Sequence, residues 1–118
     1  MHVDVRNAEG VIIVDFAGRL VAGIGDEVLH DVINELLAAE WKQILLNLSA
    51  VSRIDSAGIG ELVTSIRLAE RFETTVKLLL PGGRVRDVLE LSQILPLLDV
   101  FEDEQEAIES FRSDRPLD

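Results

Sequence analysis

Three short, nearly unbroken apolar runs alternate along this chain with stretches whose apolar residues repeat at helical spacing. The runs are Val11–Phe16, Ile44–Leu48 and Val76–Leu80. Runs of this kind are typical of strands that are buried on both faces, as in parallel sheets. Short strands that alternate with helices predict an α/β fold, in which crossover helices cover a mixed, mainly parallel sheet.

Four helices are expected between and after these strands. The first begins near Asp26, the second follows Asp55, the third spans Arg84 to Leu91, and Asp103 caps the last. In each segment the apolar residues fall on one helical face, which we expect to be buried. The inward residues would be Val28, Leu29, Val32, Ile33, Leu36 and Leu37; Ile59, Leu62, Val63, Ile66, Ala69 and Phe72; Val85, Val88 and Leu89; and Ala107, Ile108 and Phe111.

Two further strands complete the expected order ββαβαβαβα. Residues 2–6 alternate polar and apolar, and a turn at residues 7–10 would join them to the first buried strand as an antiparallel edge hairpin. Leu98 to Phe101 would form a last short strand. The second strand is expected to end before Gly18-Arg19-Leu20, and Ser49 to Asp55 is expected to be a loop.

The length of 118 residues suits one domain. We assign it to residues 1–112, with a polar, flexible tail at 113–118. The net charge of −11 argues against nucleic acid and membrane as partners, because phosphate backbones and anionic lipids would be repelled. With no cysteine and no apolar run near the ~20 residues of a membrane helix, a cytoplasmic protein is expected.

The most informative motif is Asp55-Ser56-Ala57-Gly58-Ile59-Gly60, which opens the second helix at the carboxyl end of a strand. Its simplest interpretation is an N-cap, in which a side-chain oxygen accepts a hydrogen bond from a free backbone N–H. The two glycines each cost a helix about 1 kcal/mol relative to alanine, so we expect them to leave a bare surface for another chain. The free N–H groups and the helix dipole would also stabilise a phosphate on Ser56.

Together with Gly18-Arg19-Leu20 and the strand Ile44–Leu48, this motif resembles the STAS domain family, more narrowly the bacterial anti-sigma factor antagonists, over about residues 3 to 112. The resemblance implies that Ser56 is phosphorylated by an anti-sigma factor that is also a serine protein kinase. The unphosphorylated antagonist binds that kinase, the phosphorylated form is released, and a phosphoprotein phosphatase resets it. Transcription regulation by partner switching would follow.

The resemblance also implies which residues meet the partner. Asp55, Ser56, Ala57, Gly58, Ile59 and Gly60 would form the contact surface, joined by Arg19 and Val21 at the exit of the second strand. Family members often carry an acidic residue where this chain has Val21. A scaffold subunit of a signalling or lipid-transport complex, with Ser56 never phosphorylated, is therefore an alternative.

An enzyme is not expected. A hydrolase elbow needs glycine two residues before and two after its serine, whereas Ile54 precedes Ser56. The only histidines, His2 and His30, fall at the terminus and on the polar side of the first helix, where neither would serve Ser56 as a base. The sequence carries no phosphate-binding loop, dinucleotide fingerprint or metal-ligand cluster, so we expect no cofactor and no metal.

Overall fold

The computed structural model describes residues 1–80 and 82–113. The expected tail at 113–118 lies outside these residues except for Ser113, which belongs to the last helix. The elements are β1 (His2–Ala8), β2 (Val11–Leu20), α1 (Gly25–Ala38), β3 (Gln43–Ile54), α2 (Ser56–Arg71), β4 (Thr75–Leu79), α3 (Arg84–Leu91), a 3-10 turn η1 (Leu95–Leu97), β5 (Val100–Phe101) and α4 (Glu104–Ser113).

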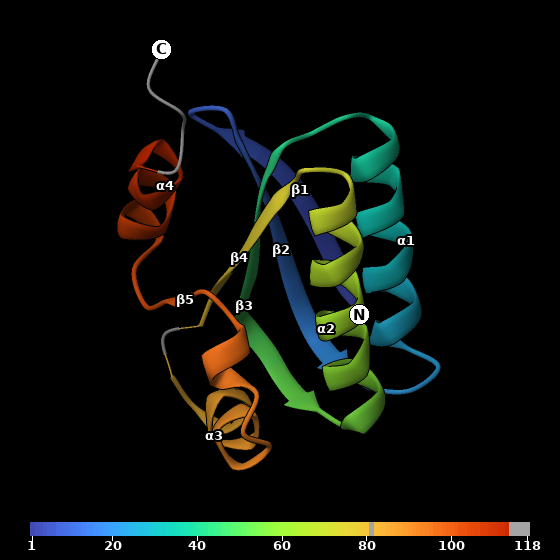
Figure 1. Cartoon of the computed structure of the whole chain (residues 1–118). Helices are drawn as coiled ribbons and strands as arrows, with labels where there is room; N and C mark the ends of the chain where they lie inside the picture. The colour runs from blue at the N-terminus through green and yellow to red at the C-terminus, as the bar shows by residue number, and fades with distance from the viewer. Residues whose placement is uncertain (81, 114–118) are drawn as a thin grey trace.

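The strands form one mixed sheet in the order β1-β2-β3-β4-β5. β1 runs antiparallel to β2, and the remaining pairs are parallel. Helices α1 and α2 lie side by side on one face of the sheet, and α4 lies on the other (Figure 1). The predicted fold class, with its antiparallel edge hairpin, mainly parallel sheet and four helices, is confirmed within the described part of the chain.

The sheet separates two hydrophobic clusters. Ile12 and Val14 of β2 point into the larger cluster, which α1, α2 and α3 cover, whereas Val11 and Ile13 point into the smaller one under α4. These four side chains are at most 4% exposed, so both faces of β2 are buried. A strand with two buried faces favours apolar residues at successive positions, which explains the nearly continuous apolar runs.

The strands β2 and β3 are longer than predicted. The expected end of β2 before Gly18 and the expected loop at Ser49–Asp55 are both wrong, because the two strands stay paired up to Leu20 and Ile54. Two register shifts, between Asp15 and Ala17 and between Gly18 and Arg19, bend the pair. One face of this extension is exposed, so its polar residues resemble a loop in the sequence.

The extension reaches past the neighbouring strands. Ala17 is the last residue of β2 that pairs with β1, and Asn47 is the last residue of β3 that pairs with β4. Residues 18–20 and 51–54 therefore form a two-stranded projection, here called the β2–β3 ribbon, whose end meets the start of α2 (Figure 1).

Smaller differences concern the ends of elements. Phe72 was expected to point inward, but α2 ends at Arg71, and Phe72 is 49% exposed at the C-cap. Ser65 takes a place on the buried face of α2 instead, at 1% exposed. The hairpin turn narrows to Glu9 and Gly10, both with positive φ, because Ala8 already pairs with Val11. The last strand is shorter than expected and follows the unpredicted turn η1.

A buried lysine on β4 bonds to α4. The side chain of Lys77 on β4 is 2% exposed and lies 3.6 Å from a carboxylate oxygen of Asp99. Its ammonium group donates to the Ser110 hydroxyl at 2.8 Å and lies 4.7 Å from the centre of the Phe111 ring. A buried ammonium needs such partners, because its desolvation is otherwise costly.

Candidate functional site

Ser56 is the first residue of α2, and its side chain is exposed. The N-cap before it is Asp55, whose extended backbone (φ −118°, ψ −175°) brings one carboxylate oxygen to the N–H of Gly58 at 3.0 Å. The prediction of an N-cap at this position is confirmed. Within the described residues the Ser56 hydroxyl makes no hydrogen bond, so it is free to be modified or bound.

The second oxygen of Asp55 reaches a different part of the chain. It accepts a hydrogen bond from the backbone N–H of Ala22 at 3.0 Å, in the turn between β2 and α1. These bonds, that from Ala22 first and that from Gly58 second, lower the pKa of Asp55 below its ordinary value. One ionised side chain thus ties the β2–α1 turn to the start of α2.

The two glycines of the motif have opposite surroundings. A Cβ on Gly58 would lie 2.1 Å from the carbonyl oxygen of Leu20, so packing against the end of β2 requires glycine there. The expectation that Gly58 leaves a bare surface is therefore wrong. A Cβ on Gly60 would meet nothing within 4 Å, and this residue does leave open space beside Ser56.

Between the glycines, Ala57 and Ile59 are half-buried, and Ile59 packs on the larger hydrophobic cluster. The open part of the predicted surface thus reduces to Ser56 and Gly60, with Ala57 and Ile59 partly accessible.

Arg19 and Val21, predicted from the resemblance, lie next to this helix start. They line a cavity of about 220 Å³ together with Ala22, Arg53 and Asp55. Arg53 is the residue that sequence reasoning missed, because it fell in a segment expected to be a loop. No alternating pattern marked this segment as a strand, since Ser52 and Arg53 are both exposed between the buried Val51 and Ile54.

Both histidines bond to carboxylates of other residues. The His30 ring bonds to Glu61 at 3.1 Å, and the His2 ring bonds to Asp4 at 3.1 Å. In residues 1–80 and 82–113, no group of three or more histidine or acidic side chains is placed to hold a metal ion. No helix in the same residues is long and apolar enough to cross a bilayer.

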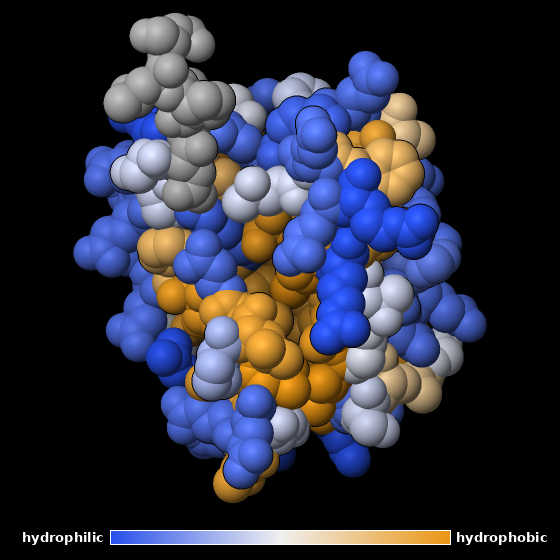
Figure 2. Space-filling view, in the orientation of Figure 1, coloured by the Kyte–Doolittle hydropathy of each residue, from blue (hydrophilic) through white to orange (hydrophobic). Residues whose placement is uncertain are grey.

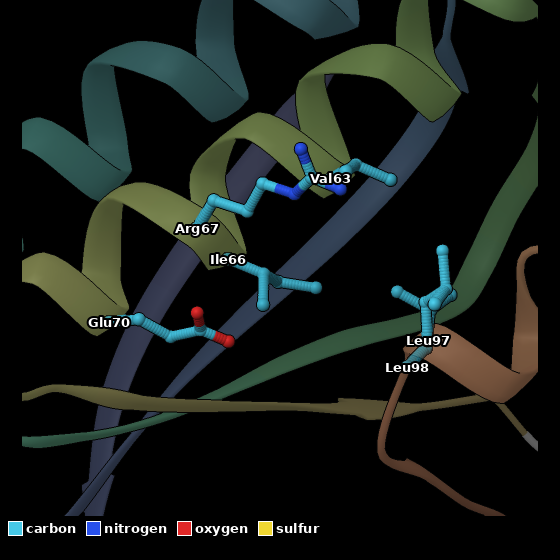
Figure 3. Close-up of a pocket in the computed structure, with 6 residues that line it drawn as sticks. All are labelled: Val63, Ile66, Arg67, Glu70, Leu97 and Leu98. Atoms are coloured by element: carbon cyan, nitrogen blue, oxygen red, sulfur yellow. The ribbon is translucent and has the colours of Figure 1, made fainter.

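A second concavity, of about 170 Å³, lies along the other half of α2. Hydrophobic side chains gather on this face between α2 and α3, and Leu97 of η1 is 64% exposed (Figure 2). Figure 3 shows Ile66 and Leu97 facing the hollow from opposite sides, with Arg67 lying along α2. Its lining residues are Val63, Ile66, Arg67, Glu70, Leu97 and Leu98. It is distinct from the Ser56 surface, since none of these residues lies in the first turn of α2.

Comparison with known proteins gives a family and a set of similar folds. The family model of the STAS domain matches residues 2–107. A candidate anti-sigma factor antagonist of Thermotoga maritima has a TM-score of 0.84 at 24% identity over 93% of this chain and 94% of its own. An anti-sigma factor antagonist of Mycobacterium paratuberculosis has 0.83 at 20% identity over 94% and 93%.

The Bacillus cell fate determinant SpoIIAA, solved in its phosphorylated form, has a TM-score of 0.68 at 22% identity over 94% of this chain and 100% of its own. At these identities the likenesses establish the fold alone. No curated protein matches the chain in sequence.

Proposed function

The chain belongs to the STAS domain family, and we propose that it is an anti-sigma factor antagonist controlled by phosphorylation of Ser56. The observation that carries the proposal is the exposed Ser56 hydroxyl at the first position of α2, directly after the Asp55 cap. The names of the structural neighbours support the general role, and one of them, SpoIIAA, is known in a phosphorylated form.

The position of Ser56 suits a switch. A phosphate there would add about −1.5 to −2 charges close to the free N–H groups and positive dipole end of α2. The first turn of α2 itself holds no acidic residue, and the neighbouring carboxylate of Asp55 is already held by the N–H groups of Ala22 and Gly58. The domain would therefore tolerate the phosphate, whereas a protein docked on the same surface would face a new, strongly hydrated charge.

In this mechanism the antagonist binds an anti-sigma factor that is a serine kinase when Ser56 is unmodified, and leaves it after phosphorylation. ATP and magnesium would belong to the kinase, and a phosphatase would restore the serine. A change from mostly bound to mostly free requires phosphorylation to weaken binding by roughly a hundredfold, a few kcal/mol. The protein acts here as a regulated binding module in the bacterial cytoplasm and not as an enzyme.

The test is a pull-down from the native cell extract, followed by mass spectrometry of residues 50–70 and by binding measurements with the recovered anti-sigma factor. Ser56→Asp should weaken binding at least tenfold and Ser56→Ala should leave it intact. Thr64→Asp is the matched control, because Thr64 is exposed on α2 two turns further along. Equal weakening by Ser56→Asp and Thr64→Asp would contradict the proposal.

Gly60 offers a second test that adds bulk without charge. Since nothing lies within 4 Å of a Cβ at this position, Gly60→Val should leave the fold intact. It should nevertheless block close approach of the partner and weaken binding at least tenfold. Unchanged affinity would remove Gly60 from the contact surface, and capture of a transporter or scaffold assembly with unmodified Ser56 would favour a non-switching subunit.

A further inference from the structure

Two arginines stand directly opposite each other on the β2–β3 ribbon. Arg19 and Arg53 are Cα partners in the parallel register of the two strands. Both are exposed, and both line the cavity of about 220 Å³ beside the start of α2. Like charges placed opposite each other on neighbouring strands destabilise a sheet. The pairing therefore has a cost that the fold alone does not explain.

Neither arginine has an anionic partner among the residues that the structure describes, although the chain has 22 acidic and 11 basic residues. Arg6, Arg86 and Arg112, in contrast, each pair with a glutamate. Asp55 lines the same cavity, but its carboxylate oxygens accept hydrogen bonds from the backbone of Ala22 and Gly58. Within residues 1–80 and 82–113 the cavity thus presents two guanidinium groups that form no ion pair, beside one carboxylate that is held by backbone N–H groups.

We propose that the arginine pair, Arg19 and Arg53, binds a carboxylate side chain of the protein that docks on Ser56, an inference that rests on the proposed function. Guanidinium groups bind carboxylates through two parallel hydrogen bonds, so a single aspartate or glutamate fits between them. A polyanion such as nucleic acid is disfavoured by the net charge of −11.

The pair also offers a route for release. Arg53 lies three residues before Ser56, at the end of the strand that leads into α2. A phosphate on Ser56 would bring its negative charge to this end of the sheet, where it would compete with the partner carboxylate for the guanidinium groups. Phosphorylation would then both occupy the arginine pair and repel the acidic residue that had been bound there.

The first experiment measures Kd and its salt dependence with the anti-sigma factor recovered in the pull-down. Arg53→Glu should weaken binding at least tenfold, and Arg19→Ala and Arg53→Ala should each weaken it about threefold and flatten the salt dependence. The matched control is Arg71→Glu, because Arg71 is exposed in the last turn of α2, away from the cavity. Equal weakening by Arg53→Glu and Arg71→Glu would overturn the inference, since net charge alone would then explain the loss.

Stability separates binding from a structural role. Arg53→Ala removes one of two opposed charges, so its melting temperature should equal or exceed that of the wild type. A lowered melting temperature that accounts for the weaker binding would overturn the inference.

A second experiment needs no partner protein. The peptide acetyl-Asp-Glu-Asp-Glu-amide, added at constant ionic strength, should shift the NMR signals of the Nε–H groups of Arg19 and Arg53 and leave that of Arg71 in place. Equal shifts for all three would overturn the inference. If the peptide shifts Arg19 and Arg53 selectively but the pull-down recovers no protein that binds at Ser56, the arginine pair is upheld and the proposed function is contradicted. If the arginine variants bind the partner normally and Ser56→Asp releases it, the proposed function is upheld and the role of the arginine pair is contradicted.

Discussion

Two helices of this chain begin in the same way and have different surroundings. Asp55 caps α2 and Asp103 caps α4, each accepting a hydrogen bond at 3.0 Å from the N–H three residues later. The α4 start is closed: Glu104 and Glu106 occupy its first turn, and Glu104 pairs with Arg6 of β1. The α2 start is open, with no acidic residue in its first turn and an exposed Ser56.

The difference teaches that an aspartate cap alone does not mark a site. Both caps satisfy backbone N–H groups, which every helix start requires. Within the part of the chain that the structure describes, the α2 start differs in that its neighbours leave a hydroxyl, a glycine whose Cβ would meet no atom, and two arginines without an ion pair accessible together. A functional assignment therefore depends on what surrounds the cap.

The largest expected effect tests how tightly α2 is seated. Gly58→Ala should lower the free energy of unfolding by about 3 kcal/mol, because its Cβ would meet backbone atoms of Leu20 that cannot move aside. Gly60→Ala, two residues away, should raise it by up to about 1 kcal/mol through helix propensity. Urea titration of both variants measures the contrast, and equal effects would show that the two glycines are not differently placed.

The next effect compares the two caps directly. Asp103→Ala should destabilise the protein by about 1 kcal/mol. Asp55→Ala should lower the melting temperature further, because it also loses the hydrogen bond from Ala22 in the β2–α1 turn. Thermal unfolding followed by circular dichroism gives both values. A smaller loss for Asp55→Ala would mean that the turn does not depend on the cap.

The third effect is a pH dependence. The pKa of Asp55 is lowered in the folded state, chiefly by the hydrogen bond from Ala22, so its contribution to stability is present above its ordinary pKa and is lost as the pH falls through the lowered value. Asp55→Asn keeps a capping oxygen but does not titrate, and should flatten the loss of unfolding free energy in acid.

Some slope should remain in Asp55→Asn, because Arg6 also lowers the pKa of Asp15. Urea titrations between about pH 6 and pH 2 measure both slopes. Identical slopes in the wild type and the variant would contradict the role given to Asp55.

The smallest effect concerns charge at the helix starts. Ser56→Asp should raise the free energy of unfolding by about 0.5 kcal/mol, since it places a negative charge at the positive end of the α2 dipole. Glu104→Gln should lower the free energy of unfolding, because it removes a negative charge at the start of α4 that pairs with Arg6. Urea titration at low salt measures both. Unfolding of Ser56→Asp would show that the α2 start cannot hold an anion.

Much of this fold is readable from the sequence because local rules decide it. The apolar runs locate the strands, helical spacing locates α1 to α4, and the Asp55 cap fixes the start of α2. The β2–β3 ribbon was missed because polar residues on one exposed face of a strand resemble those of a loop. Gly58 was misread because its constraint comes from Leu20, which is distant in sequence and close in space.

In the site, too, the features set by local sequence could be predicted, and those set by contacts distant in sequence could not. Ser56 and Asp55 were found because their roles are local to one helix start. The opposition of Arg19 and Arg53 depends on a strand register with two shifts, and no local pattern specifies such a register. The burial of Lys77 was likewise hidden, because Ser110 and Phe111 are brought to it by the last helix.

The fit of Gly58 against Leu20 bears on how this domain can diverge. A side chain at position 58 would keep full stability only in a homologue whose β2–α1 connection has changed to make room for it. A change in one of the two segments alone would give a folded but less stable domain. Residues 20–22 and 58 should therefore be inherited as a block, and chimaeras that take them from different homologues should fold less often than chimaeras that keep them together.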